Sequence, residues 1–78
     1  MRTKELLGRE VLDSSAKTIG KVIDVDFDMH QGVINRLIVK AGALKQYEID
    51  FDQITAVGDR VILKLSENQL KRISVIGL

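Results

Sequence analysis

The chain has 78 residues, the length of one small domain with a thin margin of stability. Its 12 lysines and arginines nearly balance its 11 aspartates and glutamates, so the net charge of +1 excludes a general attraction to nucleic acid or acidic membranes. Cysteine is absent, which excludes disulfides and thiolate metal sites. Self-association, most simply as a homodimer, is therefore the expected additional support for the fold.

The amino-terminal stretch and the apolar runs predict where the protein resides. The start, MRTKELLGRE, carries charges and lacks the apolar centre of a signal peptide, and no later apolar run is long enough to span a bilayer. We expect a cytoplasmic protein without a membrane span. We also expect one domain over residues 1–78, with its core in residues 5–65 and a tail in residues 66–78.

Glycines divide the chain into short apolar stretches that are typical of strands. A helical turn through Leu6 and Leu7 is predicted to end at Gly8, because glycine readily takes the left-handed conformation that ends a helix. Alternating apolar and polar residues then indicate six strands. These strands are expected near residues 9–13, 19–28, 33–41, 47–51, 55–57 and 61–65.

The stretch from Ile19 to Asp28 has the clearest alternation. Ile19, Ile23, Val25 and Phe27 are predicted to face the core, and Asp24, Asp26 and Asp28 to face solvent.

The next connection, HQG, suits a three-residue hairpin loop in which Gly32 takes the positive-φ position. This loop pairs Met29 with Val33, Val25 with Leu37, and Asp26 with Arg36 as an exposed ion pair. A loop of two or four residues would instead place Arg36 on the side of Val25.

After the sixth strand, Ser66 and Gln69 have the spacing of a capping box, which predicts a short helical turn. The final residues, ISVIGL, form an apolar tail. Six short and mostly sequential strands would leave exposed edges in an open sheet, and closure removes those edges. The sequence therefore predicts an all-β fold, a small six-stranded antiparallel barrel with a short C-terminal helical turn and an apolar tail.

Several stretches together resemble the PRC-barrel family. They are LLGREVLDSSAKTIGKVIDVDFD, GVINRLIVKAG, EIDFDQI and VGDRVIL, which cover nearly all of residues 5–65. The resemblance implies a six-stranded barrel that serves as an adaptor. Members occur at the end of ribosome maturation factors, in the cytoplasmic part of a photosynthetic reaction-centre subunit, and as small stand-alone archaeal proteins. The resemblance implies no catalytic residue, and the turn at SSAK lacks the glycine that is frequent there in the family.

The three aspartates of DVDFD are better explained as the solvated side of a strand than as a metal or catalytic site. A calcium-binding EF-hand loop would need glycine in place of Met29 and glutamate in place of Asn35. Alternating acids on any exposed strand have the spacing of paired catalytic carboxylates. His30, the only histidine, is predicted at a hairpin tip, away from any nucleophile motif. We therefore expect no enzyme, no cofactor and no metal.

Nucleic-acid binding has weak support in the sequence. Phe27 and Phe51 belong to the predicted core, so with Tyr47 they make no stacking platform. The dispersed basic residues could form at most a modest phosphate-contacting strip. That strip would contain Lys17, Lys21, Arg36, Lys40 and Lys45.

The outer face of the second and third strands is the predicted protein-binding site. Under the register above, Val22, Ile34 and Ile38 point away from the core. Asp24, Asp26 and Arg36 surround them, and an apolar centre with a charged rim is typical of a protein interface. Either the chain's own tail or a partner would cover this face.

The tail residues Ile73, Val75 and Ile76 are too apolar to remain in water and complete the predicted interface. They dock on their own barrel or cross to a second chain, and the second arrangement is favoured. The leading hypothesis is a non-enzymatic adaptor that binds an unidentified protein and itself. The alternative is an accessory factor in RNA processing or ribosome maturation, which would meet nucleic acid only through ribosome-related partners.

Overall fold

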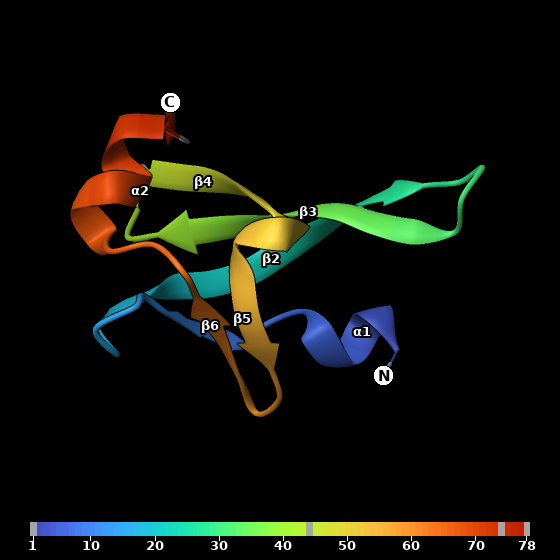
Figure 1. Cartoon of the computed structure of the whole chain (residues 1–78), viewed down its shortest axis with the longest axis horizontal. Helices are drawn as coiled ribbons and strands as arrows, with labels where there is room; N and C mark the ends of the chain where they lie inside the picture. The colour runs from blue at the N-terminus through green and yellow to red at the C-terminus, as the bar shows by residue number, and fades with distance from the viewer. Residues whose placement is uncertain (1, 44, 74, 78) are drawn as a thin grey trace.

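The computed structural model describes residues 2–43, 45–73 and 75–77. One curved sheet dominates the molecule, with a short helix near each end of the chain (Figure 1). The elements in chain order are α1 (Thr3–Leu6), β1 (Glu10–Leu12), β2 (Thr18–Asp28), β3 (Val33–Ala41), β4 (Lys45–Asp50), the 3-10 helix η1 (Phe51–Gln53), β5 (Ile54–Val57), β6 (Arg60–Leu63), α2 (Glu67–Ile73) and β7 (Val75–Gly77).

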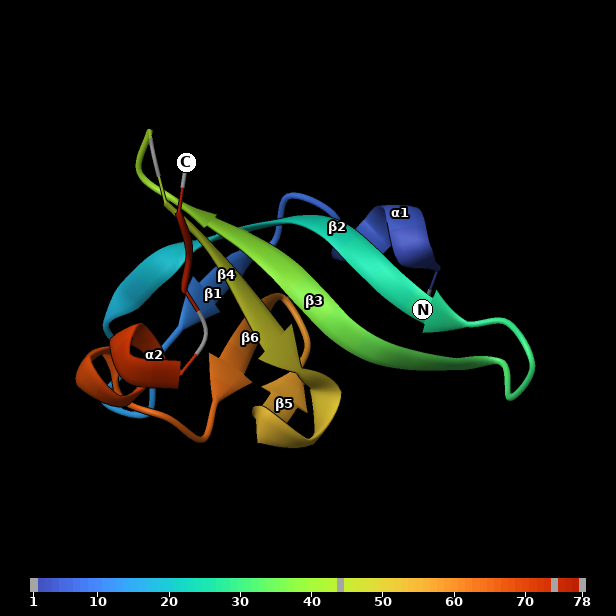
Figure 2. The same cartoon turned by 90° about the horizontal axis from the view of Figure 1, so that it is seen from above.

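The strands lie in the order β5-β6-β1-β2-β3-β4-β7, and the sheet curls into a half-barrel (Figure 2). β1 to β6 confirm the six predicted strands, and β7 adds a short seventh. The sheet is mixed, not wholly antiparallel, because β6 pairs in parallel with β1, with Glu10 opposite Arg60. The chain reaches β6 by crossing from β4 through η1 and β5 to the far side of β1. Among the described residues no pairing joins the two outermost strands, so one side of the barrel stays open.

The centre of the β2–β3 hairpin has the predicted register, with Val25 opposite Leu37 and Asp26 opposite Arg36. The predicted pairing of Met29 with Val33 is wrong, because Asp28 takes that place and leaves a loop of Met29–Gly32. The Asp28 carboxylate accepts hydrogen bonds from the backbone N–H groups of the two loop residues that follow Met29, at 2.9 and 3.1 Å. A capped turn thus replaces the predicted pair.

Two β-bulges in this hairpin move side chains to the opposite face of the sheet from the one predicted. Phe27 pairs with Ile34 whereas Asp26 pairs with Arg36, so Asn35 is an extra residue in β3. The bulge restores the central register and turns Ile34 to the inner face, where it packs against the core. The prediction that Ile34 faces outward is therefore wrong.

The second bulge lies in β2. Val22 pairs with Val39 and Asp24 with Ile38, which leaves Ile23 as the extra residue. Val22 is consequently buried in the core with 1% of its surface exposed, and Ile23 is 41% exposed. The predictions for both residues are wrong, because an extra residue shifts the two-residue period of a strand by one position.

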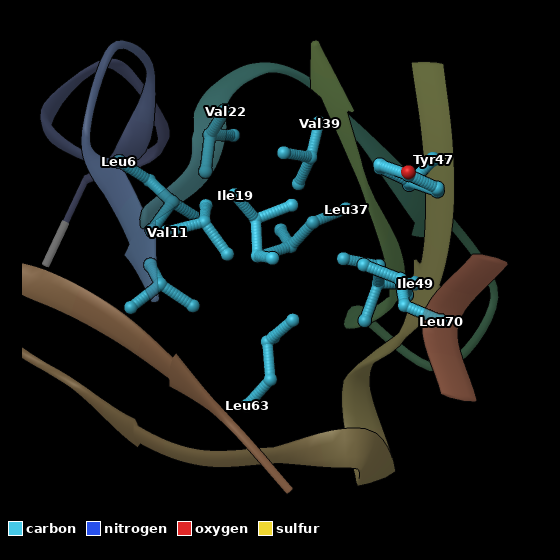
Figure 3. Packing of buried hydrophobic residues seen from close by; sticks show 11 residues of the cluster. Leu6, Val11, Ile19, Val22, Leu37, Val39, Tyr47, Ile49, Leu63 and Leu70 are labelled. Atoms are coloured by element: carbon cyan, nitrogen blue, oxygen red, sulfur yellow. The ribbon is translucent and has the colours of Figure 1, made fainter. Parts of the chain in front are cut away.

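The hydrophobic core fills the concave side of the sheet (Figure 3). Leu70, from the region predicted as the tail, is fully buried there, so α2 closes one end of the half-barrel. Among the residues whose burial the structure describes, the buried cluster contains Leu6, Val11, Ile19, Val22, Leu37, Val39, Tyr47, Ile49, Val61, Leu63 and Leu70.

The predicted capping box is present at the start of α2. The Ser66 N–H donates to Gln69 Oε1 at 2.9 Å, and the Gln69 N–H donates to Ser66 Oγ at 3.3 Å. Together the two bonds satisfy backbone donors that a helix start otherwise leaves unpaired. No helix in the described ranges is both long enough and apolar enough to cross a membrane.

Candidate functional site

Arg36 lies at the centre of the outer face of β2, β3 and β4. Its Nε lies 3.5 Å from Asp26 Oδ2, which confirms the predicted exposed ion pair, and its Nη1 forms a second pair with Glu48 Oε1. The hydrogen bond and charge of Glu48 raise the pKa of Arg36, with smaller contributions from Asp26 and Asp50 and an opposing effect of desolvation. This face is therefore a network of paired charges around one arginine.

The three aspartates of DVDFD have separate structural roles. The Asp24 carboxylate accepts a hydrogen bond from the Val25 N–H at 2.8 Å. Asp26 pairs with Arg36, and Asp28 caps the hairpin loop. Within the part of the chain that the structure describes, no three histidine, aspartate or glutamate side chains are grouped as metal ligands.

The predicted protein-binding residues do not assemble as one outer surface. Val22 is in the core and Ile34 faces inward. Of the predicted apolar centre, Ile38 alone stays on the outer face, in a shallow depression of about 250 Å³ that it shares with Asp24, Val25, Asp26, Arg36 and Glu48. An apolar centre is therefore missing from this face.

The tail adopts the first of its two expected arrangements, because its backbone docks on its own chain. In the antiparallel pair of β7 with β4, Val75 lies opposite Tyr47 and Ile76 opposite Gln46. The side chains of Ile73, Val75 and Ile76 lie outside what the structure describes. In this chain the tail thus extends the sheet.

An apolar groove lies between α1, the end of the β2–β3 hairpin, η1 and the end of β5, and sequence reasoning missed it. Its volume is about 630 Å³. Phe27 and Phe51, both predicted as core residues, border it with 42% and 40% of their surfaces exposed. The groove is lined by Arg2, Leu6, Phe27, Gly32, Ile34, Phe51 and Val57.

One of the bulges that altered the predicted core also contributes to the groove. The bulge at Asn35 turns Ile34 inward beside Phe27, and both residues lie beyond the last pairs of β2 with β1 and of β3 with β4. A period-two pattern identifies which residues face inward, but it cannot show whether enough chain remains to cover them.

Beside the groove, the end of the β2–β3 hairpin projects from the sheet (Figure 2). We call residues 27–34 the arm. The last β3–β4 pair joins Arg36 to Asp50, so the arm extends past the end of β4. Its Met29 and Val33 are 87% and 46% exposed. Phe27, Gly32 and Ile34 belong to both the arm and the groove, whereas Met29 and Val33 are exposed beside the groove and do not line it.

The possible phosphate-contacting strip is interrupted by ion pairs. Lys17 Nζ lies 2.8 Å from Glu67 Oε1, and Arg36 is held by Asp26 and Glu48. Lys21 and Lys40 remain as cross-strand neighbours between β2 and β3. This arrangement gives no specific support for a nucleic-acid interface.

The described strands thus form a small β half-barrel with an apolar groove beside its projecting hairpin. The PRC-barrel domain model matches residues 1–70, and the chain belongs to the PRC-barrel family. PRC-barrel domains are generally non-catalytic modules. No curated protein is significantly similar to the chain.

Proposed function

We propose that this chain is a non-catalytic protein-binding module of the cytoplasm whose docking surface is the groove. The exposure of Phe27 and Phe51 carries the proposal. Both are large aromatic side chains that line the apolar groove, and about two-fifths of the surface of each is exposed. Aromatic side chains at the centre of a concave surface are frequent anchors of protein interfaces. The family's generally non-catalytic character supports the same function.

The groove supports a protein partner better than the outer face does. On the outer face Arg36 is already paired with Asp26 and Glu48, so a partner would have to displace existing ion pairs. In the groove, association removes apolar surface from water, which is the dominant favourable term in most protein association. The site residues that we propose are therefore Phe27, Ile34, Phe51 and Val57, with Leu6 as the floor.

Photo-cross-linking in the source cell tests the proposal. A photoreactive amino acid replaces Phe51 in the groove, and a second variant carries it at Ile62 as the control. Ile62 is 38% exposed on β6, beside the buried Val61, and is not among the described residues that line the groove.

We expect a specific protein adduct from position 51 and none from position 62, with mass spectrometry identifying the captured chain. Equal labelling at the two positions would contradict the proposal. Capture of RNA at position 51, with an affinity that falls steeply as salt is added, would contradict the proposed function. That result would favour the alternative role in RNA processing.

A further inference from the structure

The arm lacks support from a neighbouring strand. β1 pairs with β2 only as far as Lys21, and β4 ends opposite Arg36, so no described strand flanks residues 27–34. An isolated two-stranded hairpin is at best marginally stable in water. The large exposed fractions of Met29 and Val33 add apolar surface that the chain itself leaves uncovered.

A protein surface would cover this region more completely than a small molecule would. A ligand of the groove's volume, about 630 Å³, would contact Phe27 and Phe51. It would leave Met29, at the end of the arm, in water. Large exposed apolar side chains next to an apolar pocket are typical of protein interaction sites.

A second copy of the chain offers a surface of the required shape and charge. Each chain has both a projecting arm and a concave groove, and the groove begins at the root of the arm, because Phe27, Gly32 and Ile34 belong to both. In a dimer with a two-fold axis beside the groove, the arm of each chain enters the groove of the other. The same contact is then made twice, and no arm or groove is left to bind a third chain.

The charges of the two surfaces are also complementary. Residues 27–34 contain one carboxylate, Asp28, and no lysine or arginine. Among the described residues that line the groove, the charged one is Arg2. Bringing one chain's arm to the other's groove therefore sets opposite charges near each other, which favours this orientation over a contact between two arms.

We propose that the groove receives the arm of a second copy of this chain, with Met29 inserted between Phe27 and Phe51 of the partner in a two-fold symmetric dimer. This inference rests on the proposed function and names the occupant of the same groove. It also places the dimer contact at the opposite end of the molecule from β7 (Figure 1).

The first test is the mass of the full chain in solution, measured by sedimentation over a range of concentrations. The expected mass is twice the chain's 8.7 kDa. Met29→Lys should weaken the dimer by at least about tenfold, because a charge then enters the groove. Ile62→Lys is the matched control and should leave the dissociation constant unchanged. Met29 lies in an exposed loop, so its replacement should preserve the monomer fold, as circular dichroism will show.

The second test uses the absence of native cysteine. Chains with Met29→Cys are mixed with chains carrying Phe51→Cys, and disulfide-linked dimers are measured after mild oxidation. We expect a mixed disulfide to form much faster than in the control mixture of Met29→Cys with Ile62→Cys.

The outcomes separate this inference from the function on which it rests. A full chain that stays monomeric at submillimolar concentration, a dimer insensitive to Met29→Lys, or equal disulfide rates in the two mixtures would overturn the inference. If the groove nevertheless cross-links to a different protein in the cell, the proposed function stands without it. If position 51 captures no protein at all, both are wrong.

Discussion

Gly20 shows how a single residue sets the spacing of two strands. A Cβ atom at this position would overlap the carbonyl oxygen of Lys40 on β3, with the adjoining carbonyl carbon at 2.8 Å. The obstacle is backbone, which cannot rotate away as a side chain can. The glycine of the IGKV stretch is therefore required by the close approach of β3 to β2.

Replacing Gly20 with alanine should destabilise the protein by about 2–3 kcal/mol, because the added methyl group forces the two backbones apart. Gly58→Ala is the matched control, since no atom lies within 4 Å of a Cβ at that position. The control should change stability by less than about 1 kcal/mol. Urea unfolding of the two variants measures the difference, and equal effects would show that β2 and β3 tolerate a wider spacing.

At the scale of elements, Asp13 joins the loop after β1 to the start of α2. Its carboxylate is buried, and Oδ1 accepts hydrogen bonds from the backbone N–H groups of Ser15 and Lys17, at 2.8 and 2.9 Å. Oδ2 accepts from the Glu67 N–H at 3.0 Å. The Lys17 N–H contributes most to lowering the pKa of Asp13, against the opposing effect of burial. One side chain thus holds together two segments that are distant in sequence.

This arrangement predicts a pH-dependent contribution to stability. Because the folded-state pKa of Asp13 is below the ordinary value of 3.8, its contribution is complete well above that value and is lost as pH falls through the folded-state pKa. Asp13→Asn replaces one acceptor oxygen with a donor, so it should cost about 1.5–3 kcal/mol at pH 7.

Urea unfolding of wild type and Asp13→Asn across pH 2 to 7 tests this contribution. The difference in the free energy of unfolding between wild type and Asp13→Asn should become smaller as the pH falls toward 2. A difference that stays constant with pH would mean that the carboxylate's charge contributes nothing.

Across the whole molecule, the two ends of the sheet are separate. β7 pairs with the start of β4, beside the end of β3, whereas the arm projects from the opposite end of the β2–β3 hairpin (Figure 1). The strand pairing of β7 supports the single chain, whereas the proposed dimer contact involves the arm and the groove. Stability and self-association should consequently respond to different truncations and substitutions.

Removing residues 74–78 should lower the melting temperature without changing the oligomeric state in solution. Loss of the β4–β7 pairing removes a few backbone hydrogen bonds, whose net contribution to the free energy of unfolding is about 1–2 kcal/mol. In a domain of this size that loss lowers the melting temperature by roughly 5–10 °C. Thermal unfolding and sedimentation of the truncated chain are the measurements. A loss of dimer would show that the tail contributes to association, and an unchanged melting temperature would show that its pairing adds nothing to stability.

The sequence by itself determined the elements whose causes are local. Alternation placed the six strands, and the Ser66–Gln69 spacing predicted the capping box. The central hairpin register was predicted from a three-residue loop, and it is found because the bulge at Asn35 offsets a loop that is one residue longer. Neighbouring residues specify the strands and the capping box. The pattern of short stretches was also sufficient to indicate the family.

Only the tertiary structure decided the bulges at Ile23 and Asn35, the parallel pairing of β1 with β6 and the openness of the barrel. A bulge depends on how two strands fit across the sheet, and it reverses the facing of residues such as Val22 and Ile34 without changing their local sequence. The groove depends further on how α1, η1 and β5 pack beside the end of the β2–β3 hairpin. Phe27 and Phe51 therefore fit a core pattern in the sequence and become a candidate binding surface in the fold, because exposure is a property of the whole packing arrangement.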